Sequence, residues 1–572
     1  MLQTGTAYTK PFGESIFAKQ TVTNYAYPRE ELIREPIFPY FVLDGGAFNF
    51  ANDRFGTVNG DDILSLTCSG TLFKEFRHGD PYQWERSFAY TADTGFKKKY
   101  EWQIWPQRLY MTLPLAHAFL RTGDRQYSGK WLETIKGWDA AHPYQPFDPA
   151  VHYITTDMVW RDMQVAWRTL SLLHGAFMLQ EAPFSREDWQ YIYRFIERHA
   201  QHLYEEAQDR LSRALAQNHV LQIGVALIMA GTLFPEFENS ADYIRAGSET
   251  VEMNLRGAIY ADGGSNEDSP SYSHFIVRLY LEAYLLLKNN GCKPIEGLQE
   301  SIGRQYEWLY QFSAPTGRVL RLSDSYAMDG LADLQRAERL IQLDFPRVRR
   351  NTYFPDSGAA ILRCGDLTLA VDAMSYNPGH QHLGRPQILL FFRDDPVLID
   401  AGCCNYDRWE LYLALRSPEY HNIVYSPDLM DHPDTGEKMQ LDVSLHEYDV
   451  ENSRIVLACR VRAGESEYTW QRTLQLGNDR LIIADRAESA ETIRWRSSLF
   501  FARQDSQLSP DGKTFRQLTE RWLLTASFAQ PVRQELVPVM DEDNRINYAV
   551  VTRTETKGKA FENHMELVFR ER

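Results

Sequence analysis

The sequence is poor in cysteine and has no long apolar run. Six of its 572 residues are cysteine, none in a Cys-x-x-Cys spacing, so we expect no disulfide framework. The longest apolar stretch, residues 220–234, carries Gln222 and is too short to span a membrane, so we interpret it as a buried helix. The first twenty residues lack the apolar core of a secretory signal. We therefore expect a cytoplasmic protein, or a secreted or periplasmic one if a leader has been removed.

Positive charge is also scarce. Lys and Arg total 61 against 77 Asp and Glu, which gives a net charge of −16 and disfavours a general binder of nucleic acids or anionic membranes. An anionic substrate would therefore need a locally positive site. The chain has neither a GxxxxGK[ST] motif nor a strand-linked GxGxxG, so we expect no organic cofactor.

The first half of the chain has a helical period. Between residues 107 and 345, apolar residues recur every three to four positions in about eight segments with short connections. A Ser-x-x-Asp capping box opens one segment at Ser185 and Asp188, and Gly291 stands where a helix-ending glycine is expected. Short connections favour antiparallel hairpins, so we predict an incomplete α/α toroid of helical hairpins.

From about residue 352 the pattern changes to short β-branched and aromatic runs that turn residues separate. This pattern is typical of an antiparallel β-sandwich. The predicted fold is a multidomain α + β chain. It comprises an irregular N-terminal segment packed on the helical domain (1–100), the toroid (101–348) and the sandwich (349–572).

Two polar clusters interrupt the helical half. Asn218 and His219 open its most apolar helix, and a polar loop from Asp262 leads to Tyr272 at the start of a later helix. Each has an ordinary structural interpretation, because asparagine is a good helix cap and a tyrosine can anchor a helix start. Alternatively, both clusters face a cleft.

Two further clusters lie in the second half. His380 and His382 precede a predicted strand, and on extended chain they point to opposite faces, so they can do different jobs. Asp400 ends a strand and His421 begins another. His382, Asp400 and His421 would suit a zinc site with nitrogen and oxygen donors, although a buried histidine is more often a satisfied core residue.

Taken in order, these clusters resemble the heparinase II/III family of polysaccharide lyases, across both halves of the chain. The matching sequence motifs begin with an Asn-His pair that opens an apolar helix and a DG…E.S..Y loop. It continues with an H-x-H, a strand ending LIDAG, and an R-S-x-x-x-HN-x-V stretch from Arg416 to Val424. The resemblance implies a helical toroid followed by a sandwich, and cleavage of uronate glycans by β-elimination.

The resemblance also implies a role for each matching residue. The residues that would neutralise the uronate carboxylate are Asn218 and His219, and those that would transfer protons are Tyr272 and His380. One structural divalent metal, zinc by its ligand types, would be held by His382, Asp400 and His421. The implied substrate contact is Tyr406, for which Tyr412 competes, and we expect Arg385 and Arg416 to bind substrate as well.

One departure from the family pattern concerns the residues after the two histidines. Family members often continue H-x-H-x-D, whereas this chain has Gly384 and then Arg385. Arg385 would either add positive charge to the cleft or be solvated. The departure weakens any transfer of substrate identity and leaves the two histidines untouched.

The chemistry explains why these residue types would be needed. In β-elimination a base removes the weakly acidic C5 proton beside a carboxylate, whose growing negative charge must be stabilised. The expected partner is an anionic uronate oligo- or polysaccharide, such as heparan-type chains, alginate or a glucuronate exopolysaccharide, and a homodimer is compatible with the sequence. Two alternatives stay open. They are a glycoside hydrolase that uses carboxylates between Asp262 and Asp268, and a glycan-binding protein without turnover.

Overall fold

The computed structural model describes residues 71–73, 76–77, 106–110, 112–152, 159–161, 163–374, 379–404, 409–429, 439–541 and 545–572. Contacts divide them into two compact units. Residues up to 259 together with 275–302 form a helical unit, and residues 260–274 with 303–572 form a second unit. Of the predicted N-terminal segment, only the short strands β1 (Thr71–Phe73) and β2 (Phe76–Arg77) are described.

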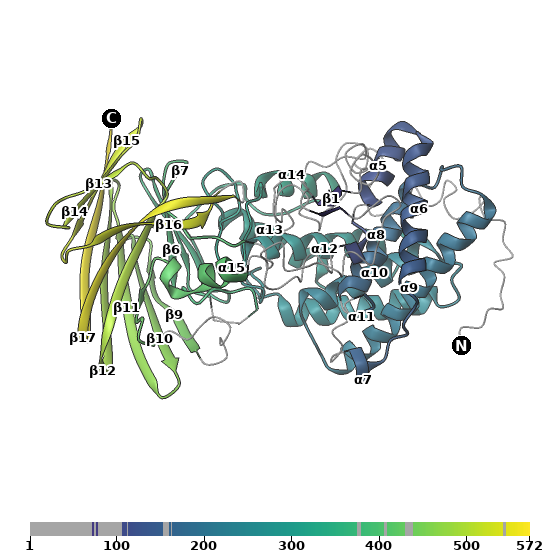
Figure 1. The fold of residues 1–572 in the computed structure, drawn as a ribbon, viewed down its shortest axis with the longest axis horizontal. Helices are drawn as coiled ribbons and strands as arrows, with labels where there is room; N and C mark the ends of the chain where they lie inside the picture. The colour runs from purple at the N-terminus through teal and green to yellow at the C-terminus, as the bar shows by residue number, and fades with distance from the viewer. Residues whose placement is uncertain are drawn as a thin grey trace. The chain divides into compact units, whose positions relative to one another are not determined.

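The helical period of the sequence corresponds to real helices (Figure 1). They are α5 (Thr112–Thr122), α6 (Arg125–Ala141), α7 (Pro149–His152), α8 (Met163–Met178), α9 (Arg186–Ser212), α10 (Asn218–Leu233), α11 (Ser240–Ala258), α12 (Pro270–Asn289), α13 (Leu298–Gln311) and α14 (Gly330–Leu340). The predicted capping box closes reciprocally between Ser185 and Asp188. Gly291 ends α12 with φ +63°, and its N–H donates to the Lys288 carbonyl, as in a Schellman motif.

Helix α10 forms the centre of the helical unit. It contacts α8, α9 and α11, and the residues from Val220 to Leu233 are all buried, as predicted for the apolar stretch. Helices α10 and α11 approach closely through glycines: a Cβ on Gly247 would lie 2.7 Å from the Gly224 carbonyl oxygen. Among the described residues, no helix is long and apolar enough to cross a membrane.

The second unit is built on antiparallel strands, as predicted, with α15 (Trp409–Arg416) between two of them (Figure 1). The strands are β3 (Thr352–Phe354), β4 (Ala359–Cys364), β5 (Leu367–Asp372), β6 (Gln387–Phe392), β7 (Asp395–Leu398), β8 (Val424–Tyr425), β9 (Met439–Asp449), β10 (Arg454–Ala463), β11 (Ser466–Leu476), β12 (Arg480–Phe501), β13 (Ser506–Leu508), β14 (Thr514–Leu518), β15 (Trp522–Phe528), β16 (Arg533–Met540) and β17 (Ile546–Glu571).

Two long strands organise this sheet. The main path of hydrogen-bonded neighbours runs β13-β14-β15-β17-β12-β7-β6-β5-β4-β3. The pairing of β12 with β17 shifts register between Glu488 and Ile493. Before the shift β12 pairs with β11, and after it β12 pairs with β8 and β7. A register shift bends a strand, so β12 can take part in two differently oriented parts of the sheet around one apolar core.

Candidate active site

The Asn-His pair lies in the first turn of α10, as predicted. The helix begins at Asn218, and its N-cap is Gln217, whose side chain makes no capping hydrogen bond. Asn218 is therefore not the helix cap of the ordinary interpretation. Its side chain is buried and its Oδ1 lies 3.4 Å from Nε2 of Gln222, one turn along the same helix, while His219 is half-buried. Both residues belong to the helical unit.

The second unit brings Tyr272 and His380 into direct contact. Their rings stack with centroids 3.6 Å apart and an interplanar angle of 22°. Tyr272 is half-buried in the first turn of α12, and the His380 side chain is 20% exposed. A hydroxyl and an imidazole that are stacked, polar and partly exposed can exchange protons with a ligand that contacts them.

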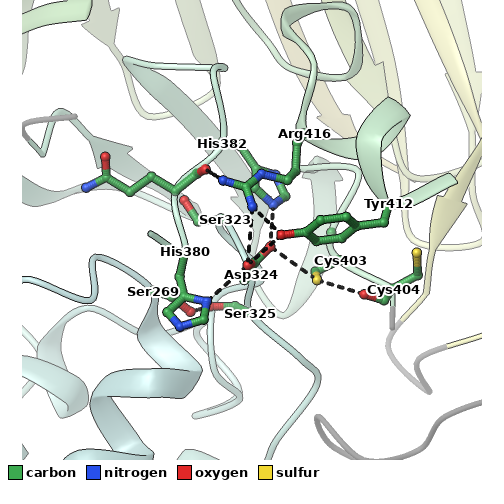
Figure 2. Close-up of polar contacts among 12 residues, drawn as sticks. Ser269, Ser323, Asp324, Ser325, His380, His382, Cys403, Cys404, Tyr412 and Arg416 are labelled. Atoms are coloured by element: carbon green, nitrogen blue, oxygen red, sulfur yellow. Dashed lines mark hydrogen bonds and ion pairs between the residues drawn. The ribbon is translucent and has the colours of Figure 1, made fainter. Parts of the chain in front are cut away.

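Asp324 connects the two histidines of the H-x-H motif, and nothing in the sequence pattern singled it out (Figure 2). One carboxylate oxygen lies 3.1 Å from Nδ1 of His380, and the other lies 2.9 Å from Nε2 of His382. The Asp324 backbone N–H also donates to the His380 carbonyl. Burial alone would raise the pKa of Asp324, but Arg416 and the two histidines outweigh burial and hold that pKa below its usual range.

The acidic loop before α12 does not form a pair of accessible carboxylates. Asp262 accepts hydrogen bonds from the Gly264 and Ser357 backbone N–H groups, which tie the loop down. Asp268 is 2% exposed, and burial raises its pKa to about 8. Only Glu267 approaches the stacked pair, with its Oε2 3.5 Å from Nε2 of His380. A glycoside hydrolase needs two carboxylates that reach the substrate, and this loop does not offer them.

His382, Asp400 and His421 lie together, all buried, with potential ligand atoms within 4.8 Å of one another. The Nδ1 atom of His421 lies 2.8 Å from Asp400 Oδ2. Within the described part of the chain, Nδ1 of His382 and Nε2 of His421 have no hydrogen-bond partner. Burial lowers the pKa of His382, which favours the neutral ring that a metal requires. This donor set fits a divalent metal. Asp324, at Nε2 of His382, would fix the orientation of the ring while Nδ1 faces the metal.

There is a steric reason for glycine at position 384, where family members often have aspartate. A Cβ built on Gly384 would overlap the imidazole ring of His421, so the bare backbone makes room for that ring. Arg385 is 1% exposed, and its guanidinium pairs with Asp372 at 3.1 Å and donates to the backbone carbonyl of Asp268. The expectation of a solvated Arg385 is therefore wrong, and its burial does not support a substrate contact.

The remaining predicted contacts lie around α15. Arg416 donates to the Gln381 carbonyl at 2.7 Å and to the Tyr412 hydroxyl, and its side chain is 16% exposed (Figure 2). Tyr412 is buried, with its hydroxyl 3.3 Å from Asp324 Oδ2, so it belongs to the support of the site. Tyr406 lies outside the described residues.

The order of these elements and residues identifies the class of protein. The family model for the heparinase II/III N-terminus matches residues 61–348. The family model for the heparinase II/III-like C-terminal domain matches residues 346–562. Since these two matches cover most of the chain, this protein belongs to the heparinase II/III family.

Individual relatives agree with that membership. The chain is 25% identical over 201 residues to a heparin-sulfate lyase of Pedobacter heparinus, a match covering 33% of this chain and 29% of the relative. It is 26% identical over 192 residues to a heparin-sulfate lyase of Bacteroides thetaiotaomicron, covering 33% of this chain and 26% of the relative. The matched stretch thus spans less than a third of either relative.

Solved structures establish the fold. A heparinase III crystal structure superposes with a TM-score of 0.74 at 15% identity, covering 98% of this chain and 92% of that one. A heparan sulfate lyase from Pedobacter heparinus gives 0.62 at 16% identity, with 98% and 88% covered. The predicted combination of a helical toroid with an antiparallel β-sandwich is confirmed.

Proposed function

We propose that this protein is a polysaccharide lyase that cleaves uronate-containing glycans by β-elimination. The observation that carries the proposal is the stacked pair of Tyr272 and His380, which Asp324 anchors from behind. Membership in the heparinase II/III family supports the same reaction class. A glycan-binding protein without turnover would have no use for a buried aspartate that fixes one ring nitrogen of a partly exposed histidine.

In the proposed reaction one member of the pair removes the C5 proton and the other protonates the leaving oxygen. As the C5–H bond breaks, its electrons form the C4–C5 double bond, and the C4–O bond breaks toward the departing sugar. The acceptor and donor exchange one proton each with substrate, so the pair returns to its starting state after a proton transfer between its members or with water. Asp324 does not touch substrate in this scheme; it orients His380.

Asn218 and His219 are proposed to bind the uronate carboxylate. An amide and an imidazole can both donate hydrogen bonds to the charge that grows there in the transition state. The position of both residues in the first turn of α10, with Gln217 as the helix cap, supports this role.

Zinc is the metal we propose for His382, Asp400 and His421, since two imidazoles and a carboxylate suit its preference for nitrogen and oxygen donors. When bound, the ion would add a rigid link between the segments that carry its ligands. His382 follows His380 by two residues in the loop before β6 (residues 379–386, here the reactive loop), and Asp324 joins their side chains. The metal would therefore stabilise the loop without entering the reaction.

The substrate we propose is a glycosaminoglycan of the heparan sulfate type. Support comes from the relatives named as heparin-sulfate lyases and from Arg416, a partly exposed cation beside the reactive loop. Since the protein carries a net charge of −16, binding of an anionic chain must rely on local positive charge, and activity should fall as salt is added. A rate that salt leaves unchanged would point to a neutral glycan.

The test is ultraviolet absorbance over time with heparan sulfate, other glycosaminoglycans, alginate and glucuronate exopolysaccharides, each as polymer and oligosaccharide. Elimination leaves a double bond conjugated to the carboxylate, so absorbance rises, whereas hydrolysis creates reducing ends without that rise. An increase with heparan sulfate alone would support the proposal in full. New reducing ends without absorbance would replace it with hydrolysis, and binding without either product would make the protein a glycan-binding module.

A further inference from the structure

A second cluster of potential metal ligands lies in the helical unit, apart from every residue assigned above. It comprises His152 at the end of α7 and His202 and Glu206 on α9 (both helices are labelled in Figure 1). All three side chains are buried, and one ligand atom from each lies within 4.8 Å of the others. His202 and Glu206 are one helical turn apart, so α9 presents both on the same face.

Polar atoms in this cluster lack the partners that buried groups normally have. Within the described residues, neither ring nitrogen of His202 makes a hydrogen bond, and Oε2 of Glu206 accepts none. The backbone of Gln145 is near enough to favour protonation of His202 weakly, without a hydrogen bond of ordinary geometry. Burying such polar groups without a partner destabilises the folded state, so a bound ion that engages them would be stabilising.

The surroundings exclude water and keep the His202 ring neutral. The rings of Tyr144, Phe147 and Trp160 pack around it at centroid distances of 6.1, 5.9 and 5.7 Å. Burial, the largest influence, lowers the pKa of His202 to about 4. A neutral imidazole with a free lone pair is the form that coordinates metals.

We propose that His152, His202 and Glu206 bind a divalent metal ion, with zinc the best fit. Two imidazoles and one carboxylate are a common zinc donor set. Nε2 of His152 lies 3.2 Å from Oε1 of Glu206. Two ligands of a tetrahedral zinc ion, each about 2.1 Å from the metal, lie roughly 3.4 Å apart. The ion would fasten α7, and the loop that carries it, to the middle of α9.

Two arginines near the cluster show how its side chains could pair in the absence of a metal ion. Arg210 donates to Oε1 of Glu206 at 2.9 and 3.2 Å, and Arg168 disfavours a positive charge on His202. Without a metal, His152 Nε2 faces Glu206 Oε1 at 3.2 Å. That arrangement uses Oε1 alone and leaves both His202 nitrogens unpaired, whereas a bound ion would take one His202 nitrogen as a ligand together with His152 and Glu206.

The test is zinc content per chain of purified protein after dialysis against a weak chelator, compared among variants. His202→Gln should bind one zinc fewer than the wild type, whatever the sandwich ligands hold. The control is His199→Gln on the same helix, because both nitrogens of His199 are already bonded, to the Phe195 carbonyl at 2.7 Å and to Arg168 at 2.8 Å. This control should lose stability and keep its zinc.

A measurement on the wild type covers the case in which His202→Gln does not fold. Hydrogen exchange of peptides from α7 and the centre of α9 should slow at least tenfold when zinc is restored to metal-depleted protein. Equal zinc content in a folded His202→Gln variant, or exchange in these peptides that zinc does not alter, would overturn the proposal. Lyase activity plays no part in either readout, so its presence or absence cannot be confused with the result.

Discussion

The Asp324→Asn variant tests whether Asp324 acts by positioning His380 and not by touching substrate. The carboxylate accepts hydrogen bonds from His380 at 3.1 Å and from His382 at 2.9 Å. Asparagine keeps only one acceptor oxygen, so one of the two imidazoles must face an amide group that can only donate. Arg416, whose Nη1 lies 3.9 Å from the carboxylate, loses its opposite charge as well.

The expected magnitudes follow from these contacts. A hydrogen bond to a charged group contributes about 1.5–3 kcal/mol, and breaking a buried ionic pair costs about 3–5 kcal/mol. We therefore expect the free energy of unfolding to fall by about 3–5 kcal/mol. If His380 turns away from its working orientation, kcat should fall about 10²- to 10⁴-fold while KM changes little, which is the contribution of a positioned acid or base.

The assay follows formation of the unsaturated uronate by absorbance over a range of pH, with unfolding measured in urea. The matched control is Asp333→Asn, because Asp333 forms another buried aspartate–histidine pair, with His274 at 2.8 Å. It should lose comparable stability and keep kcat. A folded Asp324→Asn variant with the wild-type kcat and an unaltered pH profile would refute the positioning role.

Three further predictions use the same assays. Tyr272→Phe should abolish turnover and preserve binding, whereas Tyr284→Phe, further along α12, should be silent; turnover near wild type in the former would remove Tyr272 from proton transfer. Gly384→Ala should displace the His421 imidazole and lower the content of the metal proposed for His382, Asp400 and His421, while Gly303→Ala, where a Cβ meets nothing within 4 Å, should raise stability slightly; an unchanged metal content in the former would disprove the steric argument. The pKa of Asp268 rises from 3.8 to about 8 on folding, so the folded state holds this proton more tightly and stability declines as pH rises through that window. Asp268→Asn should flatten the decline in urea unfolding, and an unchanged slope would contradict the shift.

Much of the fold could be predicted from short sequence signals, because helix caps and turns depend on residues that are close together in the chain. The capping box at Ser185 and the C-terminal glycine of α12 need only neighbouring residues, and both formed as expected. The helical period of the sequence is weak in α6, because polar residues and two glycines, Gly129 and Gly137, interrupt its apolar positions. Strands β13, β14 and β15 pair with one another in sequence order, and of the three only β15 pairs with the distant β17.

The candidate site was predictable only where a residue sits in a motif. His380, His382 and Asp400 carry local signals, whereas Asp324 lies 56 and 58 positions from the two histidines it binds. Its neighbours in sequence are serines, a pattern that occurs in any polar loop. The burial of Arg385 could not be predicted either, because Arg385 lies in a loop, its partner Asp372 ends β5, and no spacing rule joins them.

The position of β17 constrains how the chain can be made. This strand follows all of its partners in the sequence and, among the described strands, it is the one that joins β15 and β16 to β12. During synthesis, β12, β15 and β16 therefore keep unpaired edges until β17 has been made. Such edges are templates for pairing with other chains. Interruption of translation before β17 should yield an aggregating product rather than a smaller folded one.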